Sequence, residues 1–124
     1  MDQACPFCSV DNSEHVLKNE VGFVRYDLFP VSPGHALVIP FRHVPSYFDI
    51  SDNERQSLWD LVNEAKVLVD REFKPDAYNI GVNVGDVAGQ SVPHLHIHLI
   101  PRYQGDMQNP RGGVRGVIPE KQKY

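Results

Sequence analysis

Long apolar segments are absent from this 124-residue sequence. No run approaches the about 20 residues that a helix needs to cross a bilayer, so we expect no membrane partner. The first residues, MDQACPFC, have neither the basic start nor the apolar stretch of a signal peptide, and we therefore expect a cytoplasmic location. With 41% hydrophobic and 23% charged residues, the composition predicts one globular domain over residues 1–124.

An excess of positive charge is also absent. The sequence has 12 Lys and Arg residues against 16 Asp and Glu residues, which gives a formal net charge of -4 at pH 7. This balance argues against a polymeric nucleic acid as partner, because such partners are held by a broad positive surface. Single nucleotides remain possible ligands.

Cysteine is scarce, and its two residues lie close together as Cys5 and Cys8 in the motif CPFC. In a reducing compartment this spacing is typical of half a metal site or of a redox pair. The spacing alone does not choose between these two functions.

Several short segments have the pattern of strands. Residues 15–28 predict two short strands joined by a turn around 19–22, since apolar residues there mix with polar neighbours. Residues 35–40 (HALVIP) are apolar and β-branched enough for a buried strand. Residues 78–84 alternate apolar side chains with Asn and Gly, which is strand periodicity.

One long amphipathic helix is predicted from about residue 51 to residue 73. Ser51 and Glu54 have the spacing of a capping box at its start. Lys74-Pro75 ends it, because proline disfavours the helical conformation in the residue before it. The apolar residues that recur on one face are Leu58, Leu61, Val62, Ala65, Leu68 and Val69.

Histidine and aliphatic residues alternate strictly in the segment 94–101 (HLHIHLIP). On a strand, the side chains of His94, His96 and His98 would all project from one face at intervals of about 7 Å. A solvated polar face, a metal site and a phosphoryl-transfer site with a neutral imidazole nucleophile are all compatible with this pattern.

The wider context of these histidines resembles the histidine triad family over nearly the whole chain. The matching segments are Asp27, SPGHALVIP with His43 following it, the long helix, and GDVAGQSVPHLHIHLIPR. The resemblance implies an α+β, HIT-like fold with a mostly antiparallel sheet, one long helix and a short helix. It also implies a homodimer in which two sheets form one continuous sheet.

By the same resemblance, the protein is a nucleotide hydrolase that cleaves at the α-phosphate through a covalent nucleotidyl-histidine intermediate. Dinucleoside polyphosphates such as diadenosine tetraphosphate or triphosphate are the expected substrates, and they would arrive as magnesium complexes. The alternatives are a purine nucleoside phosphoramidase and a nucleotide-binding module without turnover. A histidine at position 98 argues against the transferase and phosphorylase branches, which carry glutamine there.

The resemblance assigns the chemistry to four residues. His96 is the nucleophile, His98 donates a hydrogen bond to a phosphate oxygen, Ser91 serves the leaving group, and His94 completes the triad. An uncharged nitrogen suits attack on an anionic phosphorus centre. To keep that nitrogen free, the other ring nitrogen must donate its proton to a fixed acceptor, such as a backbone carbonyl on the same strand.

Substrate contacts are implied in the same way. Asp27 matches the residue that holds the ribose hydroxyls, and Asn83 matches a position near the phosphate. The glycine-containing loop would present N–H groups to phosphate oxygens. Together with His98, Asp27 and Asn83, the predicted substrate-binding residues are Gly89, Gln90, Ser91 and Val92 in the loop and Phe7, Leu28 and Ile39 in a base pocket.

Resemblance to zinc-carrying members implies a structural Cys₂His₂ zinc site made by Cys5, Cys8, His43 and His94. Residues 1–10 would then form a zinc-binding N-terminal segment, and the alternative is two buried free thiols. Residues 104–124 are polar and rich in glycine, and they predict an extended tail. The excess of positive charge in residues 110–124 suggests that the tail folds over a neighbouring cleft and helps to select substrates, whereas a frayed terminus is the alternative.

Overall fold

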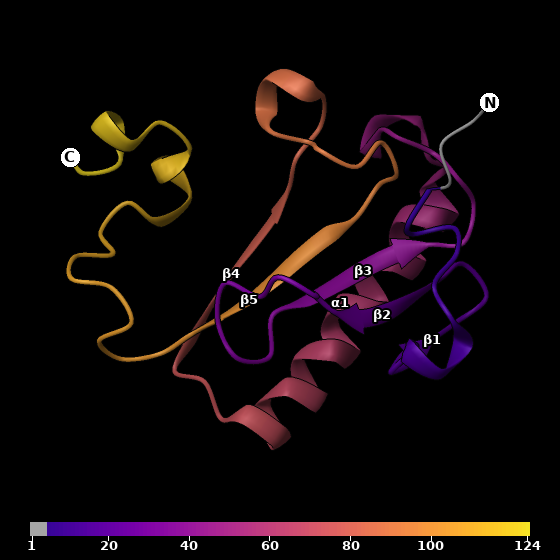
Figure 1. Cartoon of the computed structure of the whole chain (residues 1–124), viewed down its shortest axis with the longest axis horizontal. Coiled ribbons are helices and arrows are strands. Elements are labelled where there is room, and N and C mark those ends of the chain that lie inside the picture. Colours follow the sequence, from indigo (N-terminus) through magenta and orange to yellow (C-terminus); the bar gives the residue numbers. More distant parts are fainter. Residues whose placement is uncertain (1–4) are drawn as a thin grey trace.

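The computed structural model describes residues 5–124 and contains a five-stranded sheet (Figure 1). All of its strand pairs are antiparallel, and the order across the sheet is β1-β2-β3-β5-β4. The α+β architecture predicted from the sequence is therefore confirmed. The strands are β1 (Leu17–Lys18), β2 (Gly22–Tyr26), β3 (Ala36–Pro40), β4 (Ala77–Val82) and β5 (Ile97–Arg102).

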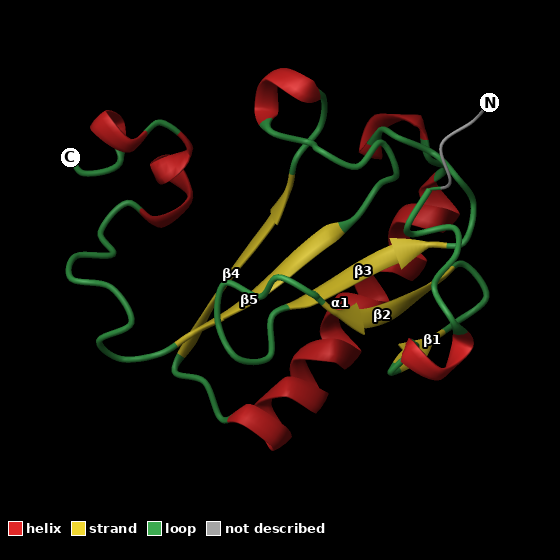
Figure 2. Ribbon diagram, viewed as in Figure 1, coloured by secondary structure: helices red, strands yellow, loops and turns green. Residues whose placement is uncertain are grey.

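One long helix, α1 (Asp52–Phe73), lies across one face of the sheet (Figure 2). The predicted capping box is present, since the Ser51 hydroxyl accepts from the Glu54 N–H and the Glu54 carboxylate accepts from the Ser51 N–H. Lys74 ends the helix in a left-handed conformation with a φ of 52°. Leu58, Leu61 and Ala65 are fully buried against the sheet, as the helical spacing predicted.

The two faces of the sheet are covered by different parts of the chain. Successive side chains of a strand point to opposite faces, and those that face α1, such as Val38 and Ile97, belong to the main core. On the opposite face Phe23, Leu37 and Ile39 form a second cluster, against which Phe7 and Val10 of the N-terminal segment pack. Because both faces are covered, β3 is buried along its whole length.

The strand that carries the histidines begins later than predicted, at Ile97. His94 lies in a bend, and Leu95 donates its N–H to Val44 O at 2.8 Å, in a loop and not in a strand. The predicted alternation nevertheless holds, because Leu95, Ile97 and Leu99 are all in the core. The three histidines therefore share the face opposite α1.

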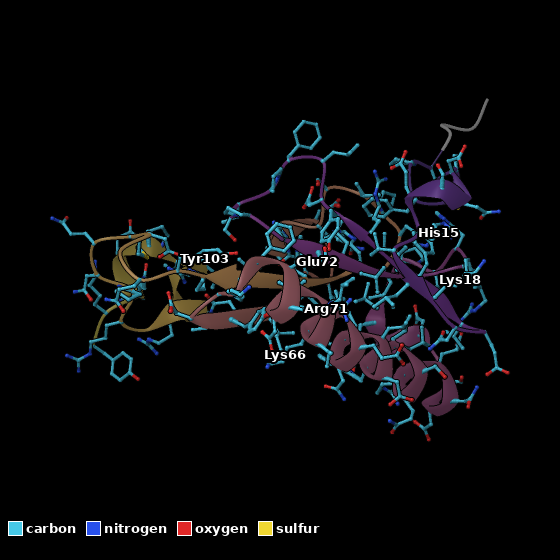
Figure 3. The ribbon with its side chains drawn as sticks, turned by 90° about the horizontal axis from the view of Figure 1, so that it is seen from below. His15, Lys18, Lys66, Arg71, Glu72 and Tyr103 are labelled. Carbon is cyan, nitrogen blue, oxygen red and sulfur yellow. The ribbon has the colours of Figure 1, made fainter. Side chains whose placement is uncertain are left out.

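The predicted extended tail is wound into turns in the structure. It contains two 3-10 helices, η4 (Gly113–Val117) and η5 (Pro119–Lys121). Arg115 holds them together by donating to Lys121 O at 2.8 Å and to Gln122 O at 3.3 Å. In Figures 1 and 3 this segment lies at the β4 end of the molecule, away from β1.

Short 3-10 helices also occur elsewhere, and they take the place of the short helix that was expected. They are η1 (Asn12–Glu14), η2 (Tyr47–Asp49) and η3 (Asp86–Ala88). Within residues 5–124, no helix combines the length and the apolar character that a membrane crossing requires.

Candidate active site and metal centre

A cavity of about 390 Å³ lies on the sheet face opposite α1. Its volume is in the range of pockets that hold small molecules. The N-terminal segment, the loop after β2 and the loop before β5 surround it. The lining residues are Pro6, Phe7, Arg25, Asp27, Leu28, Phe29, Leu37, Asn83, Gly89, Ser91, Val92, His96 and His98.

His96 has its tautomer fixed by the backbone. Its Nδ1 lies 2.8 Å from His94 O. Since a carbonyl oxygen can only accept, Nδ1 carries the proton and Nε2 keeps its lone pair in the neutral ring. The ring is 8% exposed and lies edge-on to Phe7, with 4.9 Å between ring centroids. His96 therefore has one unprotonated nitrogen available at the cavity.

The tautomer of His98 is fixed by a chain of two histidines. Val31 donates its N–H to His35 Nδ1 at 3.0 Å, so the proton of the neutral His35 ring is on Nε2. His35 Nε2 lies 3.0 Å from His98 Nδ1, which must then accept. His98 consequently carries its proton on Nε2, as a hydrogen-bond donor in the cavity lining.

The rings of His35 and His98 are both neutral near pH 7. Burial, with the nearby His96 and His35 rings, lowers the pKa of His98 to about 4. Burial also lowers the pKa of His35, although Asp27 opposes that shift. A neutral His98 can hold its proton on one nitrogen and accept at the other, as the two tautomer assignments require.

Asp27 is placed beside these histidines by the loop that follows β2. Its Oδ1 accepts the Phe29 N–H at 2.9 Å, and its Oδ2 lies 3.5 Å from His35 Nε2. Asp27, His35 and His98 are close enough to hold a metal ion as a group. His35 is not suited to be a ligand there, however, because its Nδ1 lone pair is used by Val31 and its Nε2 bears the proton. The group is better described as a hydrogen-bonded network.

Three of the predicted catalytic and substrate-binding residues lie outside the cavity lining. Gln90 is buried, and its side chain accepts the Gly85 N–H and donates to Pro45 O, both at 2.8 Å, so it shapes the loop. Ile39 is fully buried in the second cluster, and the pocket wall is instead formed by Leu37, two residues earlier on the same face. His94 is fully buried and contributes its backbone carbonyl to His96.

Sequence reasoning missed His35, Leu37 and Arg25. His35 was noted only as the start of a buried strand, and the alternation of that strand places Leu37 on the same face. Arg25 could have been noticed as a charged residue inside an otherwise apolar strand. None of the three patterns has the specificity of the histidine alternation.

The four predicted metal ligands come together at one end of β3. Cys5 Sγ and Cys8 Sγ lie 3.3 and 3.5 Å from His94 Nδ1. His43 Nδ1 lies 3.3 Å from Cys8 Sγ and 3.1 Å from His94 Nδ1. Zinc bonds of about 2.0 to 2.3 Å in a tetrahedron give edges of about 3.3–3.8 Å, close to these separations. The four residues thus lie close enough to bind one metal ion.

His94 is in the protonation state that a metal requires. Its Nε2 lies 2.8 Å from Pro40 O, so Nε2 is the donor and the lone pair of Nδ1 faces the two sulfur atoms. Burial lowers the pKa of His94 and keeps the ring neutral. The donor set and the outer hydrogen bond both fit a Cys₂His₂ zinc site.

Comparison with known proteins identifies the family. Residues 9–105 match the family model described as the HIT domain. The chain belongs to the HIT domain family. The matched range includes both cavity-lining histidines, His96 and His98, whereas Cys5, Cys8 and most of the tail lie outside it.

Relatives of this HIT domain have names that refer to nucleotide chemistry. A Schizosaccharomyces pombe protein named bis(5'-nucleosyl)-tetraphosphatase (asymmetrical) is 42% identical over 80 residues, which are 64% of this chain and 44% of that protein. A Dictyostelium discoideum protein named bis(5'-adenosyl)-triphosphatase is 37% identical over 100 residues, 81% of this chain and 67% of the relative. The chain thus spans less than half the length of the first relative.

One solved structure of the family is described as zinc-bound. The zinc-bound histidine triad family protein from Mycobacterium smegmatis matches this HIT domain with a TM-score of 0.72 and 28% identity. The match covers 86% of this chain and 80% of the other chain. The fold predicted from the sequence is therefore shared with a family member.

Proposed function

We propose that this HIT domain hydrolyses dinucleoside polyphosphates at the α-phosphate through a nucleotide covalently bound to His96. The observation that carries the proposal is the pairing of two opposite tautomers in one cavity. His96 offers the lone pair of Nε2, and His98 offers the proton of Nε2. A nucleophile and a hydrogen-bond donor beside each other are what phosphoryl transfer requires.

In the first step, His96 Nε2 attacks the α-phosphorus. A phosphorus–nitrogen bond forms while the bond to the bridging oxygen breaks, and the departing nucleoside polyphosphate keeps the electron pair. We assign Ser91, which lines the cavity, as the group that donates a hydrogen bond or proton to the leaving oxygen. His98 Nε2–H stabilises the charge on a non-bridging oxygen.

In the second step, water attacks the same phosphorus atom. The phosphorus–nitrogen bond breaks, the lone pair returns to His96 Nε2, and a nucleoside monophosphate is released. The attacking water gives up one proton, to Ser91 when that group has protonated the leaving oxygen and otherwise to solvent. The other parts of the cavity would hold the nucleotide through both steps: Asp27 the ribose hydroxyls, Asn83 and the loop 89–92 the phosphates, and Phe7 and Leu28 the base.

Two relatives support the substrate class, since they are named as a bis(5'-nucleosyl)-tetraphosphatase and a bis(5'-adenosyl)-triphosphatase. Purine nucleoside phosphoramidates share the same α-phosphate chemistry and are the second candidate. For such a substrate the cavity of about 390 Å³ needs to hold only one nucleotide. The test measures kcat/KM for diadenosine tetraphosphate beside an adenosine phosphoramidate. If neither compound is hydrolysed while nucleotide binding is intact, the protein is a nucleotide-binding module without catalytic activity.

For the metal centre we propose a structural zinc ion held by Cys5, Cys8, His43 and His94. All four positions would be protein ligands, so no coordination site would remain for water or substrate. The ion would join the N-terminal segment to the loop that carries His94. Phe7 lies between the two cysteines in sequence and touches the His96 ring, so the ion would also fix one wall of the cavity.

We further propose that two copies pair through β4. It is an edge strand, and its outer side has no strand partner within residues 5–124. Ile80 is 43% exposed, and no atom lies within 4 Å of the position that a Cβ on Gly81 would occupy. β4 contains no charged residue and no proline, and an edge strand of this kind can pair with another strand. Antiparallel pairing of two copies would give the continuous sheet.

A further inference from the structure

Arg25 lines the cavity but has no role in the proposed reaction. Its charged side chain is nevertheless buried, which is energetically costly. Its side chain is 8% exposed, and it lines the cavity together with the apolar Phe7, Leu28 and Leu37. Burying a guanidinium among apolar groups is unfavourable unless its hydrogen bonds are made. The partners of Arg25 are therefore informative about the ligand.

The guanidinium is only partly satisfied by the protein. Its Nη2 donates to the carboxylate of Glu14, and the buried Nε has no hydrogen-bond partner. Within the part of the chain that the structure describes, Nη1 likewise has no partner. The Glu14 side chain is itself half exposed, so water screens the ion pair from one side. Nη1 and the second N–H of Nη2 therefore remain free to donate to a ligand, whereas Nε is buried away from it.

Sheet register places Arg25 where the base of a bound nucleotide would lie. Arg25 pairs with Leu37 across β2 and β3, and Leu37 pairs with His98 across β3 and β5. All three side chains share one face, and two strand spacings put the Cα atoms of Arg25 and His98 about 10 Å apart. A nucleotide whose α-phosphate lies at His96 and His98 and whose ribose lies at Asp27 would extend its base toward Leu37 and Arg25.

We propose that Arg25 recognises the edge of the nucleobase and makes this site prefer guanine over adenine. This inference rests on the nucleotide function proposed above. Guanine presents two acceptors, O6 and N7, on one edge, and a guanidinium can donate to both. Adenine presents N7 beside an amino group, so one donor of Arg25 would face another donor. Glu14 accepts from Nη2 and thereby orients the guanidinium.

The test compares bis(5'-guanosyl) tetraphosphate with bis(5'-adenosyl) tetraphosphate, because both ends of each compound carry the same base. Wild-type protein is expected to have the higher kcat/KM for the guanosyl compound by about 5- to 150-fold, the discrimination given by a good bidentate contact. Arg25→Met removes the donors at similar length and should bring the ratio close to one. Arg25→Lys retains the charge without the planar fork and should retain only a small preference.

Two control variants separate base recognition from a general effect. Glu14→Gln removes the partner charge but leaves Arg25, and it should keep a preference for guanine. Arg71→Met changes an arginine on α1, on the other face of the sheet (Figure 3), and should leave the ratio unchanged. A wild-type ratio near one, or the same ratio in Arg25→Met and wild type, would overturn the inference.

Equilibrium binding distinguishes a failure of this inference from a failure of the proposed reaction. Calorimetric titration with GMP and AMP requires no turnover. If neither dinucleotide is hydrolysed but GMP binds more tightly in an Arg25-dependent way, the hydrolase function fails and the base recognition stands. If both compounds are hydrolysed at equal rates and bind equally, the hydrolase function stands and the base recognition fails.

Discussion

His35 Nε2 and His98 Nδ1 lie 3.0 Å apart, and the Val31 N–H that reaches the other side of the His35 ring decides which of them donates. The proton is on His35 Nε2, so the donor of His98 is its Nε2 in the cavity lining. His98 on β5 thus obtains its tautomer from His35, the residue immediately before β3. In this arrangement His35 is a positioning residue.

Two substitutions of His35 test whether it sets the tautomer of His98. The amide nitrogen of Gln is near the Nε2 position, so His35→Gln can still donate to His98, whereas the shorter Asn cannot. We expect His35→Asn to lower kcat by about 100-fold, the cost of losing one donor to the transition state, and His35→Gln to retain more activity. Nitrogen chemical shifts of the His98 ring report the tautomer directly. An unchanged His98 tautomer in His35→Asn would contradict the relay.

His96→Ala should reduce kcat by about three orders of magnitude or more, because it removes the proposed nucleophile. Nucleotide binding should stay largely intact, since Asp27, Leu37 and the loop 89–92 remain. The measurements are single-turnover kinetics, calorimetric binding of AMP, and mass spectrometry of wild-type protein quenched during turnover. The wild-type mass should increase by one nucleotidyl group. Near-normal kcat in His96→Ala would rule out the covalent route.

Elemental analysis of purified protein should find one zinc ion per chain, and Cys5→Ser should lose it. Zinc bound only by the folded state adds about 4 kcal/mol to the free energy of unfolding at a free concentration about 1,000 times its Kd. Chelation should therefore lower the Tm of the wild type. Because Phe7 lines the part of the cavity proposed to hold the base, metal loss should raise KM more than it lowers kcat. Full stability in a metal-free preparation would contradict a structural ion.

The pKa of His98 makes stability depend on pH in a defined window. It is about 4 in the folded protein and 6.5 in the unfolded chain, so between these values the unfolded state binds more protons. This contribution to stability is present above pH 6.5 and is lost as the pH falls toward 4. Urea unfolding at pH 6.5, 5.5 and 4.5 should show a steeper loss in wild type than in His98→Gln. Equal slopes would show that His98 does not titrate as described.

Ile80→Asp should prevent association of two copies, because it places a charge in the middle of the proposed β4 pairing. Light scattering after size-exclusion chromatography is expected to show a dimer for the wild type and a monomer for the variant. Val67→Asp is the matched control, since Val67 is also an exposed aliphatic residue but lies on α1. A monomeric wild type, or a dimer in Ile80→Asp, would exclude pairing through β4.

The sequence by itself determined the features that depend on local periodicity. The alternation of His94, His96 and His98 with aliphatic residues put the three imidazoles on one face as soon as the segment became extended. Ser51 and Glu54 marked the start of α1 because a capping box closes within four residues. The free Nε2 of His96 followed from a carbonyl two residues away on the same segment. Each of these relationships is local in the chain.

Only the tertiary structure decided which residues meet across the fold. Cys5 and His94 are 89 residues apart and His35 and His98 are 63 apart, and no local pattern specifies such contacts. The register of β2, β3 and β5 placed Arg25 and Leu37 in line with His98, and a shift of one residue would have moved Arg25 to the opposite face. Register depends on packing of both sheet faces and is therefore a property of the folded whole.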